Sequence, residues 1–93
     1  MSQGGLHLMV RGRVQGVGFR WFVREEARRL GLAGWVSNRP DGAVELAASG
    51  PATALADLRL TVAGGPPSAR VDELVELPLA DVGEMPFPFS VRR

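Results

Sequence analysis

The sequence predicts an α+β fold in which two helices cover one face of an antiparallel sheet. Segments of alternating and of helical periodicity follow one another along the chain, and glycine or proline separates them. Apolar residues make up 45% of the 93 residues, which is enough aliphatic and aromatic side chain for one hydrophobic core. We therefore expect a single domain over residues 1–93.

The first strand and the first helix are predicted from their different periods. Residues 6–11 alternate between apolar and other side chains, which predicts a half-buried strand that ends at Gly12. In residues 19–30 the apolar positions recur at spacings of three and four, and charged side chains fill the opposite side. This second pattern predicts an amphipathic helix that Gly31 ends in a left-handed conformation.

A β-hairpin and a second helix are predicted next. Residues 35–38 form a short strand that leads into the turn at residues 39–42, and residues 43–49 alternate again. Pro51 is expected at the first position of the second helix, because proline has no N–H to lose there. The apolar residues that follow recur at helical spacing, and the helix is expected to end before Gly64.

The last part of the chain predicts two further strands. Residues 71–77 read as a strand with a bulge at the adjacent apolar residues Leu74 and Val75. Residues 87–91 alternate between apolar residues and others that include proline, which suits a short C-terminal edge strand. The order βαββαβ is that of a ferredoxin-like sandwich, and right-handed crossovers place the four main strands in the order 4-1-3-2.

Composition excludes several kinds of chemistry. The chain has no cysteine, all 11 basic residues are arginine, and the net charge is +1. These counts exclude thiolate sites, Schiff-base lysines and lysine-dependent phosphate loops, and they do not favour general nucleic-acid binding.

The N-terminus has no signal pattern, and no run of about 18 apolar residues occurs. We expect a cytoplasmic monomer with no membrane or nucleic-acid partner.

The segment Gly12–Arg20, GRVQGVGFR, lies where the first strand changes into the first helix. Its three glycines allow positive φ and a close backbone approach, and free N–H groups at a helix N-terminus favour an anion. Arg20 adds a guanidinium in the first turn of the helix. The alternative is an ordinary glycine-rich turn with Arg20 in a surface ion pair.

Asn38 ends the second predicted strand. In the predicted topology the first and second strands are parallel with the third between them, so their C-terminal ends lie about 10 Å apart. The Asn38 amide can therefore lie near an anion held by the glycine loop, at a distance that a substrate and one water can bridge. The alternative is that Asn38 is an ordinary turn residue.

Other catalytic groups are absent or poorly placed. His7 is expected to face solvent without a partner, and the chain has no GK[ST] signature. Four aspartates are scattered without metal-ligand spacing: Asp41, Asp57, Asp72 and Asp81. The remaining functional groups are arginine, asparagine and backbone N–H groups. They can bind a phosphoryl group and orient water, but they supply no strong nucleophile and no metal. These groups suit an already activated substrate, such as a carboxylic–phosphoric anhydride.

At these residues the sequence resembles the acylphosphatase family. The resemblance covers nearly the whole chain, and its first two blocks are highly specific in this order. The matching blocks are Gly12–Arg20, Gly34–Asn38 with Asp41–Glu45, and more loosely Gly65–Val71 and Phe89–Val91.

The resemblance implies a ferredoxin-like fold and hydrolysis of acyl phosphates to a carboxylate and inorganic phosphate, without metal or cofactor. It implies that Arg20 binds the phosphate, that Asn38 orients the water, and that the substrate's own phosphate accepts the water's proton. Ser37 departs from the basic residue often found before the asparagine, and the loop at Gly64 is richer in glycine than usual. The residues whose backbone would cradle the phosphate are Gln15, Gly16, Val17, Gly18 and Phe19.

Two other classes of function are weighed against hydrolysis. An anion-binding module without turnover would use the loop but would not need Asn38. A single-stranded RNA binder of similar topology stacks bases on sheet aromatics, and residues 6–10 contain none of phenylalanine, tyrosine and tryptophan. The resembling domain also occurs at the N-terminus of a large hydrogenase-maturation carbamoyltransferase, but we expect a free-standing enzyme from the length of this chain.

Overall fold

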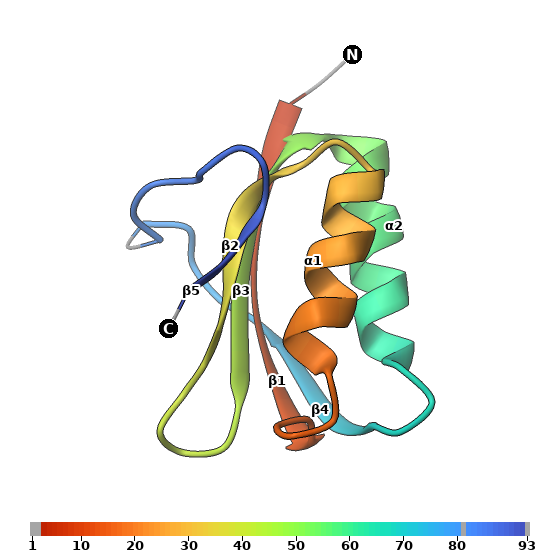
Figure 1. Ribbon diagram of the computed structural model, residues 1–93. Coiled ribbons are helices and arrows are strands. Elements are labelled where there is room, and N and C mark those ends of the chain that lie inside the picture. The colour runs from red at the N-terminus through yellow and green to blue at the C-terminus, as the bar shows by residue number, and fades with distance from the viewer. Residues whose placement is uncertain (1–2, 81, 93) are drawn as a thin grey trace.

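A single five-stranded sheet carries both helices on one of its faces (Figure 1). The structure is a computed structural model that describes residues 3–80 and 82–92, so Asp81 lies outside the described residues. The elements in chain order are β1 (Gln3–Arg13), α1 (Phe19–Arg29), β2 (Ala33–Asn38), β3 (Val44–Pro51), α2 (Ala52–Gly64), β4 (Arg70–Glu76) and β5 (Ser90–Arg92). The predicted order of elements is confirmed.

The sheet topology brings two loops to the same end of the molecule. The strand order is β4-β1-β3-β2-β5, which confirms the predicted order of the first four strands. β1 and β2 each pair antiparallel with β3, so they run parallel to each other on its two sides. The β1–α1 loop and the β2–β3 turn follow their C-terminal ends and lie together at the bottom of Figure 1. β5 pairs parallel with β2 and forms the edge of the sheet, as predicted, but it begins at Ser90, later than the predicted start at Phe87.

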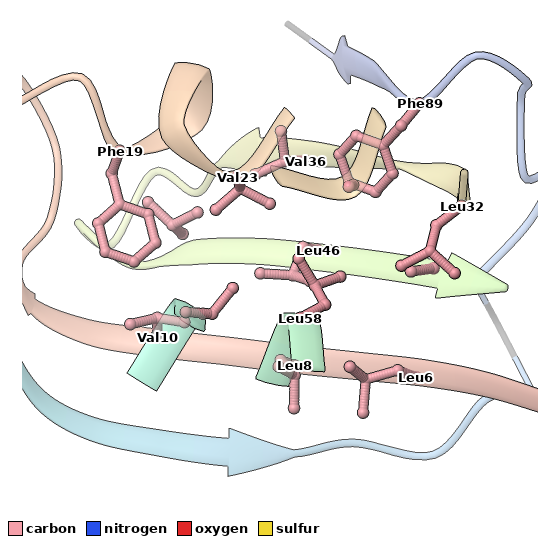
Figure 2. Close-up of a cluster of buried hydrophobic side chains, with 14 of the residues drawn as sticks. Leu6, Leu8, Val10, Phe19, Val23, Leu32, Val36, Leu46, Leu58 and Phe89 are labelled. Carbon is pink, nitrogen blue, oxygen red and sulfur yellow. The ribbon is translucent and has the colours of Figure 1, made fainter. Parts of the chain in front are cut away.

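The core lies between the helices and the sheet. On the face that the helices cover, β1 buries alternate residues, and each helix buries one stripe of side chains, so that the sticks in Figure 2 form one continuous cluster. Burying one such large apolar side chain stabilises the fold by about 1.5–3 kcal/mol. No helix in the described ranges is long and apolar enough to cross a membrane. The buried hydrophobic residues of β1, α1 and α2 are Leu6, Leu8, Val10, Phe19, Val23, Ala27, Leu55, Leu58 and Val62.

Two predicted boundaries of the second helix are wrong. Pro51 is the extended N-cap of α2 and pairs with Gln3 at the end of β3, so the helix begins one residue later than predicted. Gly64 is still helical, because Gly65 takes the positive φ of 67° at which the chain leaves the helix. The predicted left-handed end of the first helix is confirmed, with φ of 72° at Gly31.

The predicted bulge occurs in β4 but at another residue. The pairing of β1 with β4 shifts between Arg11 and Gly12, which leaves Asp72 as the extra residue. Leu74 and Val75 keep regular partners in β1. Both are half-buried, because each face of β4 is partly covered. A strand that is covered on both faces does not show a regular alternation of apolar and polar residues in its sequence.

A long segment after β4 covers the face of the sheet opposite to the helices. This crossing segment, residues 77–80 and 82–89, connects β4 at one edge of the sheet to β5 at the other (Figure 1). The indole N–H of Trp35 donates to a backbone oxygen of the crossing segment at 2.9 Å. The sequence did not predict that this face of the sheet is covered, because apolar residues have no regular spacing in the crossing segment.

The prediction that His7 faces solvent is therefore wrong. Only 7% of His7 is exposed, and both ring nitrogens have oxygen partners. Nδ1 lies 2.7 Å from the backbone oxygen of Pro78 in the crossing segment, and Nε2 lies 2.6 Å from Glu45 Oε2 on β3. A carbonyl oxygen only accepts, so Nδ1 is the donor to Pro78. His7 thus joins the crossing segment to the sheet.

Candidate active site

The β1–α1 loop, residues 14–18, owes its shape to two glycines. Gly16 and Gly18 have φ of 74° and 77°, in the left-handed region that side-chain-bearing residues rarely adopt. A Cβ added at either glycine would meet no other atom within 4 Å. The glycines are therefore required for the direction of the backbone and not for packing, and the space beside the loop is open.

The N-terminus of α1 opens onto this loop without a cap from the protein. Gly18 is the N-cap residue, no side chain of residues 3–80 or 82–92 caps the helix, and the first turn contains no acidic residue. The first N–H groups of a helix have no partner within the helix, and they carry its partial positive charge. This end of α1 is therefore suited to an anion.

Arg20 lies in the first turn of α1 and is half-buried. Within residues 3–80 and 82–92 it forms no ion pair with a carboxylate. The alternative in which Arg20 serves a surface ion pair therefore has no partner among the described residues. Its positive charge adds to that of the helix terminus.

Two side chains fix the loop to its surroundings. Gln15 Nε2 donates to the backbone oxygens of Arg39 and Ala43, at 2.8 and 2.9 Å, on the two sides of the β2–β3 turn. Ser68 Oγ donates to the oxygen of Val17 at 3.1 Å, from the loop before β4. The loop is thus held in place relative to the turn that follows β2.

A pocket of about 220 Å³ lies between the loop, the start of α1 and the end of β2. This volume is below the roughly 300–1,000 Å³ of sites for drug-sized ligands, so it suits a small molecule. The described residues that line it are Val14, Gly16, Gly18, Phe19, Arg20, Trp21, Asn38 and Val91.

Asn38 lines this pocket, and its side chain carries an unpaired acceptor. It is the last residue of β2, and its Oδ1 is buried without a hydrogen-bond partner in the part of the chain that the structure describes. Leaving a buried polar atom unpaired costs about 1–3 kcal/mol, and native proteins pair most such atoms. Asn38 lines the pocket, so a ligand or water that reached its amide oxygen would compete with no hydrogen-bond partner from the described residues.

The turn after Asn38 is stabilised by Asp41. Asp41 Oδ1 accepts from the Ala43 N–H at 3.1 Å, and Oδ2 accepts from the Arg11 guanidinium at 3.1 Å. The Ala43 hydrogen bond, followed by Arg11, holds the pKa of Asp41 below its usual value despite an opposing effect of partial desolvation. The β2–β3 turn is therefore hydrogen-bonded to β1, through Arg11, as well as to the β1–α1 loop, through Gln15.

The structure brings most of the predicted site residues together. Gly16, Gly18, Phe19, Arg20 and Asn38 line one pocket, although Asn38 comes from a different element. Two predicted loop residues do not line it. The side chain of Gln15 points to the β2–β3 turn, and Val17 packs against the core.

Three lining residues were not predicted: Val14, Trp21 and Val91. Trp21 carried a signal in the sequence, because it directly follows Arg20 and interrupts the polar side of the amphipathic helix. Val91 could not be assigned, since its place in the pocket depends on the parallel pairing of β5 with β2.

The donor set defines what the pocket can do. An arginine and free backbone N–H groups attract an anion, and an amide oxygen can accept a hydrogen bond from water. The described lining residues include no carboxylate and no imidazole, so they offer a metal ion no ionised ligand. The pocket can therefore bind an anion, stabilise added negative charge and orient water.

Comparison with known proteins identifies relatives across most of the chain. The family model described as Acylphosphatase matches residues 6–87. The acylphosphatase of Nitrobacter hamburgensis (strain DSM 10229 / NCIMB 13809 / X14) is 53% identical over 73 residues, which cover 78% of this chain and 74% of that protein. The acylphosphatase of Latilactobacillus sakei subsp. sakei (strain 23K) is 51% identical over 81 residues, with 86% and 88% covered.

Solved structures agree with this finding. The crystal structure of acylphosphatase from Bacillus subtilis superposes with a TM-score of 0.85 and 40% sequence identity, covering 99% of this chain and 100% of that one. The structure of an acylphosphatase from Coxiella burnetii gives a TM-score of 0.80 at 38% identity, with 97% and 93% covered. The similarity in sequence and in fold therefore extends over the pocket as well as the core.

Proposed function

Because this chain belongs to the acylphosphatase family of acyl phosphate hydrolases, we propose that its β1–α1 loop and Arg20 hold the substrate phosphate while Asn38 orients the attacking water. The enzyme splits acyl phosphates into a carboxylate and inorganic phosphate. The proposal concerns how the residues of this chain divide that work.

One observation carries the proposal. The pocket combines unpaired donors from α1 with an unpaired, buried acceptor from β2, the Oδ1 of Asn38. A site that only bound phosphate would need donors, since a phosphate dianion presents acceptor oxygens. An acceptor at this place is suited to water, which donates hydrogen bonds and has a lone pair left for attack.

The loop and Arg20 stabilise the phosphoryl group. The N–H groups at residues 15–19 and the guanidinium of Arg20 would surround its nonbridging oxygens. Hydrogen bonds to charged oxygens are about twice as strong as neutral ones, and charge on these oxygens is what phosphoryl transfer requires to be stabilised. Since the loop is held by Gln15 and Ser68, little reorganisation is needed when substrate binds.

The reaction breaks one bond and forms one. The water oxygen attacks phosphorus opposite to the acyl oxygen, the P–O bond to the acyl group breaks, and its electron pair leaves with the carboxylate. The pKa of a carboxylic acid is about 4, against about 10 for a phenol, so this leaving group needs no proton. Orienting the water and stabilising the charge on the phosphoryl oxygens are then sufficient for catalysis.

The proton of the water goes to a phosphoryl oxygen of the substrate. The described lining residues include no carboxylate or imidazole that could accept it, and the phosphate oxygens are the nearest bases to a water held by Asn38. The products are then a carboxylate and dihydrogen phosphate, and the enzyme is unchanged. No metal ion and no cofactor takes part in this scheme.

The test of this function is a measurement of phosphate release from benzoyl phosphate and acetyl phosphate, in the presence of EDTA. We expect turnover of both compounds that EDTA does not reduce and Mg²⁺ does not increase. Phenyl phosphate is the matched control, because it keeps the aromatic ring and the phosphate but has a phenolate leaving group. We expect it to bind as an inhibitor and to be hydrolysed far more slowly.

Three results would contradict parts of the proposal. Activity that EDTA abolishes and Mg²⁺ restores would show that the reaction depends on a metal ion. Rapid hydrolysis of phenyl phosphate would show that the site supplies more than positioning. Phosphate binding without turnover of any acyl phosphate would identify an anion-binding module.

We further propose that the chain acts as a single-domain monomer in the cytoplasm, with no nucleic-acid or membrane partner. The absence of cysteine from all 93 residues and a net charge of +1 support this proposal. The pocket is formed by elements of one chain, so catalysis does not require a second copy. Sedimentation velocity tests the monomer, and a dimer whose dissociation abolishes activity would contradict it.

A further inference from the structure

Trp21 lines the pocket and is largely exposed to solvent. Trp21 follows Arg20 in the first turn of α1, and 58% of the residue is accessible to solvent. Four large hydrophobic residues are exposed among the described residues, and Trp21 alone of these lines the pocket. The other three are Leu60, Leu79 and Phe87.

Arg24 holds the ring of Trp21 in place. The guanidinium carbon of Arg24 lies 4.1 Å from the centroid of the indole ring, one turn further along α1. Glu25 fixes Arg24 in turn, through hydrogen bonding at 3.2 Å. A cation–π contact of this kind contributes about 0.5–1 kcal/mol at an exposed site, and it reduces the side-chain entropy that Trp21 would lose on binding a ligand.

The pocket has a polar part and an apolar part. Gly16, Gly18, Arg20 and Asn38 form the polar part, where the proposed phosphate and water lie. The apolar part consists of four side chains, of which Val14 and Phe19 are each only 1% exposed. The apolar surface that a ligand can reach is therefore supplied mainly by Trp21, with Val91 on β5.

We propose that Trp21 determines specificity for the acyl group of the substrate. With the phosphate on the glycine loop, the acyl group extends into the apolar part of the same pocket and packs against the indole ring. A flat aromatic acyl group gains the most from this contact, whereas an acetyl group is too small to cover the ring. The inference rests on the proposed function, since it assumes that an acyl phosphate is bound with its phosphate at Arg20.

The expected size of the preference is moderate. The indole ring is an open platform and not a closed pocket, so it favours a large apolar group without excluding a small one. Apolar contacts of this kind discriminate by about 10- to 200-fold in closed pockets, and we expect about tenfold here. Because the contact exists before and during the reaction, it acts mainly on KM.

The experiment compares kcat/KM for benzoyl phosphate and acetyl phosphate in wild type, Trp21→Ala and Trp21→Phe. Comparing the ratio of the two values between each variant and wild type removes the intrinsic difference between the leaving groups. We expect Trp21→Ala to lower the ratio about tenfold, through KM for benzoyl phosphate. Trp21→Phe keeps an aromatic platform and should retain most of the ratio. Leu60→Ala, at another exposed hydrophobic residue outside the pocket, is the matched control and should not change it.

Each other outcome has a definite meaning. An unchanged ratio in Trp21→Ala would overturn the inference, whether both substrates keep their rates or both lose them equally. Equal losses would show that Trp21 supports the start of α1. If the wild type hydrolyses neither compound, the proposed function itself fails, and circular dichroism of each variant separates all these outcomes from misfolding.

Discussion

Arg20 is the charged side chain nearest to the reaction that we propose. It lies in the first turn of α1, lines the pocket and has no carboxylate partner among the described residues. Its fork of N–H groups can bind two oxygens of one phosphate at once. The guanidinium is therefore free to respond to charge that develops on the phosphoryl group.

We predict that Arg20→Ala loses about 3 kcal/mol or more of transition-state stabilisation, measured as kcat/KM for an acyl phosphate. Competitive inhibition by inorganic phosphate should weaken in parallel, because substrate and product are held by the same guanidinium. Arg59→Ala is the matched control, since Arg59 is an exposed arginine on α2 that does not line the pocket. Near-normal kinetics in Arg20→Ala would exclude the assigned role.

Single residues were predicted from the sequence where their neighbours in the chain determine their position. Asn38 is the last residue of β2, and Arg20 lies just after the short loop that follows β1, so their approach to one another could be predicted from topology. His7 and Trp21 could not be placed in this way. The burial of His7 depends on Pro78, 71 residues further along the chain, and the place of Trp21 in the pocket depends on Asn38 and Val91, which come from other elements.

The β1–α1 loop and the β2–β3 turn act as one unit. Gln15 links them with two hydrogen bonds, to Arg39 and Ala43, and so fixes the distance between the proposed phosphate site and Asn38. Both acceptor oxygens also receive a backbone N–H, from Gly42 and Arg39 respectively, so the turn does not depend on Gln15 alone. Gln15 is therefore a positioning residue.

We predict that Gln15→Ala lowers kcat at least about tenfold, because small displacements of reacting groups reduce rates strongly. Inhibition by phosphate should weaken less than kcat falls, since Arg20 and the helix terminus remain. The free energy of unfolding should fall by about 1 kcal/mol, the typical contribution of a lost hydrogen bond. A variant that loses only stability, with kcat and phosphate inhibition intact, would contradict a positioning role.

Asp41 makes the β2–β3 turn sensitive to acid. Its pKa is lowered in the folded protein, chiefly by the Ala43 N–H and then by Arg11. A carboxyl group with a lowered pKa stabilises the fold at pH values above its unfolded pKa, and the contribution is lost as pH falls through the folded pKa.

We predict that Asp41→Asn is less stable than wild type at neutral pH and that the difference shrinks as pH falls below about 4. Asn keeps the acceptor for the Ala43 N–H but lacks the charge that attracts Arg11. Urea unfolding at several pH values measures both proteins. A difference that stays constant from neutral to acid pH would show that the charge of Asp41 contributes nothing.

The elements themselves were predicted well and their boundaries less well. Periodicity identified both helices and the strands, because each has one buried face. The bulge was misplaced since Leu74 and Val75 are both half-buried, on opposite faces of β4. The start of α2 was misplaced because Pro51 suits an N-cap as well as a first helical position.

At the scale of the whole molecule, the crossing segment covers the second face of the sheet and brings β5 into place. β5 in turn supplies Val91 to the pocket. His7 joins β1, Glu45 on β3 and the crossing segment, and Arg39 extends this network to the β2–β3 turn through its ion pair with Glu45 at 2.9 Å. The sequence could not predict that the crossing segment covers this face, because the apolar residues of the segment have no regular spacing.

We predict that His7→Ala lowers the free energy of unfolding by about 2 kcal/mol, because it removes a buried side chain that makes two hydrogen bonds, one of them to a carboxylate. His7→Gln can still donate to one of the two acceptors and should lose less. Both variants should keep kcat close to that of wild type, since His7 lies on the face opposite to the helices. Unchanged stability of His7→Ala in chemical denaturation would show that this network does not hold the crossing segment.

The division of work between binding phosphate and orienting water is tested most directly with Asn38→Ala. The measurement is kcat for benzoyl phosphate alongside the inhibition constant for inorganic phosphate, with Ser37→Ala as the neighbouring control and thermal melting to establish folding. We expect a severe loss of kcat with phosphate inhibition nearly intact, because the loop and Arg20 still bind the anion. A folded Asn38→Ala enzyme that keeps its kcat, or one whose phosphate affinity falls as far as its kcat, would contradict the assignment of water orientation to Asn38.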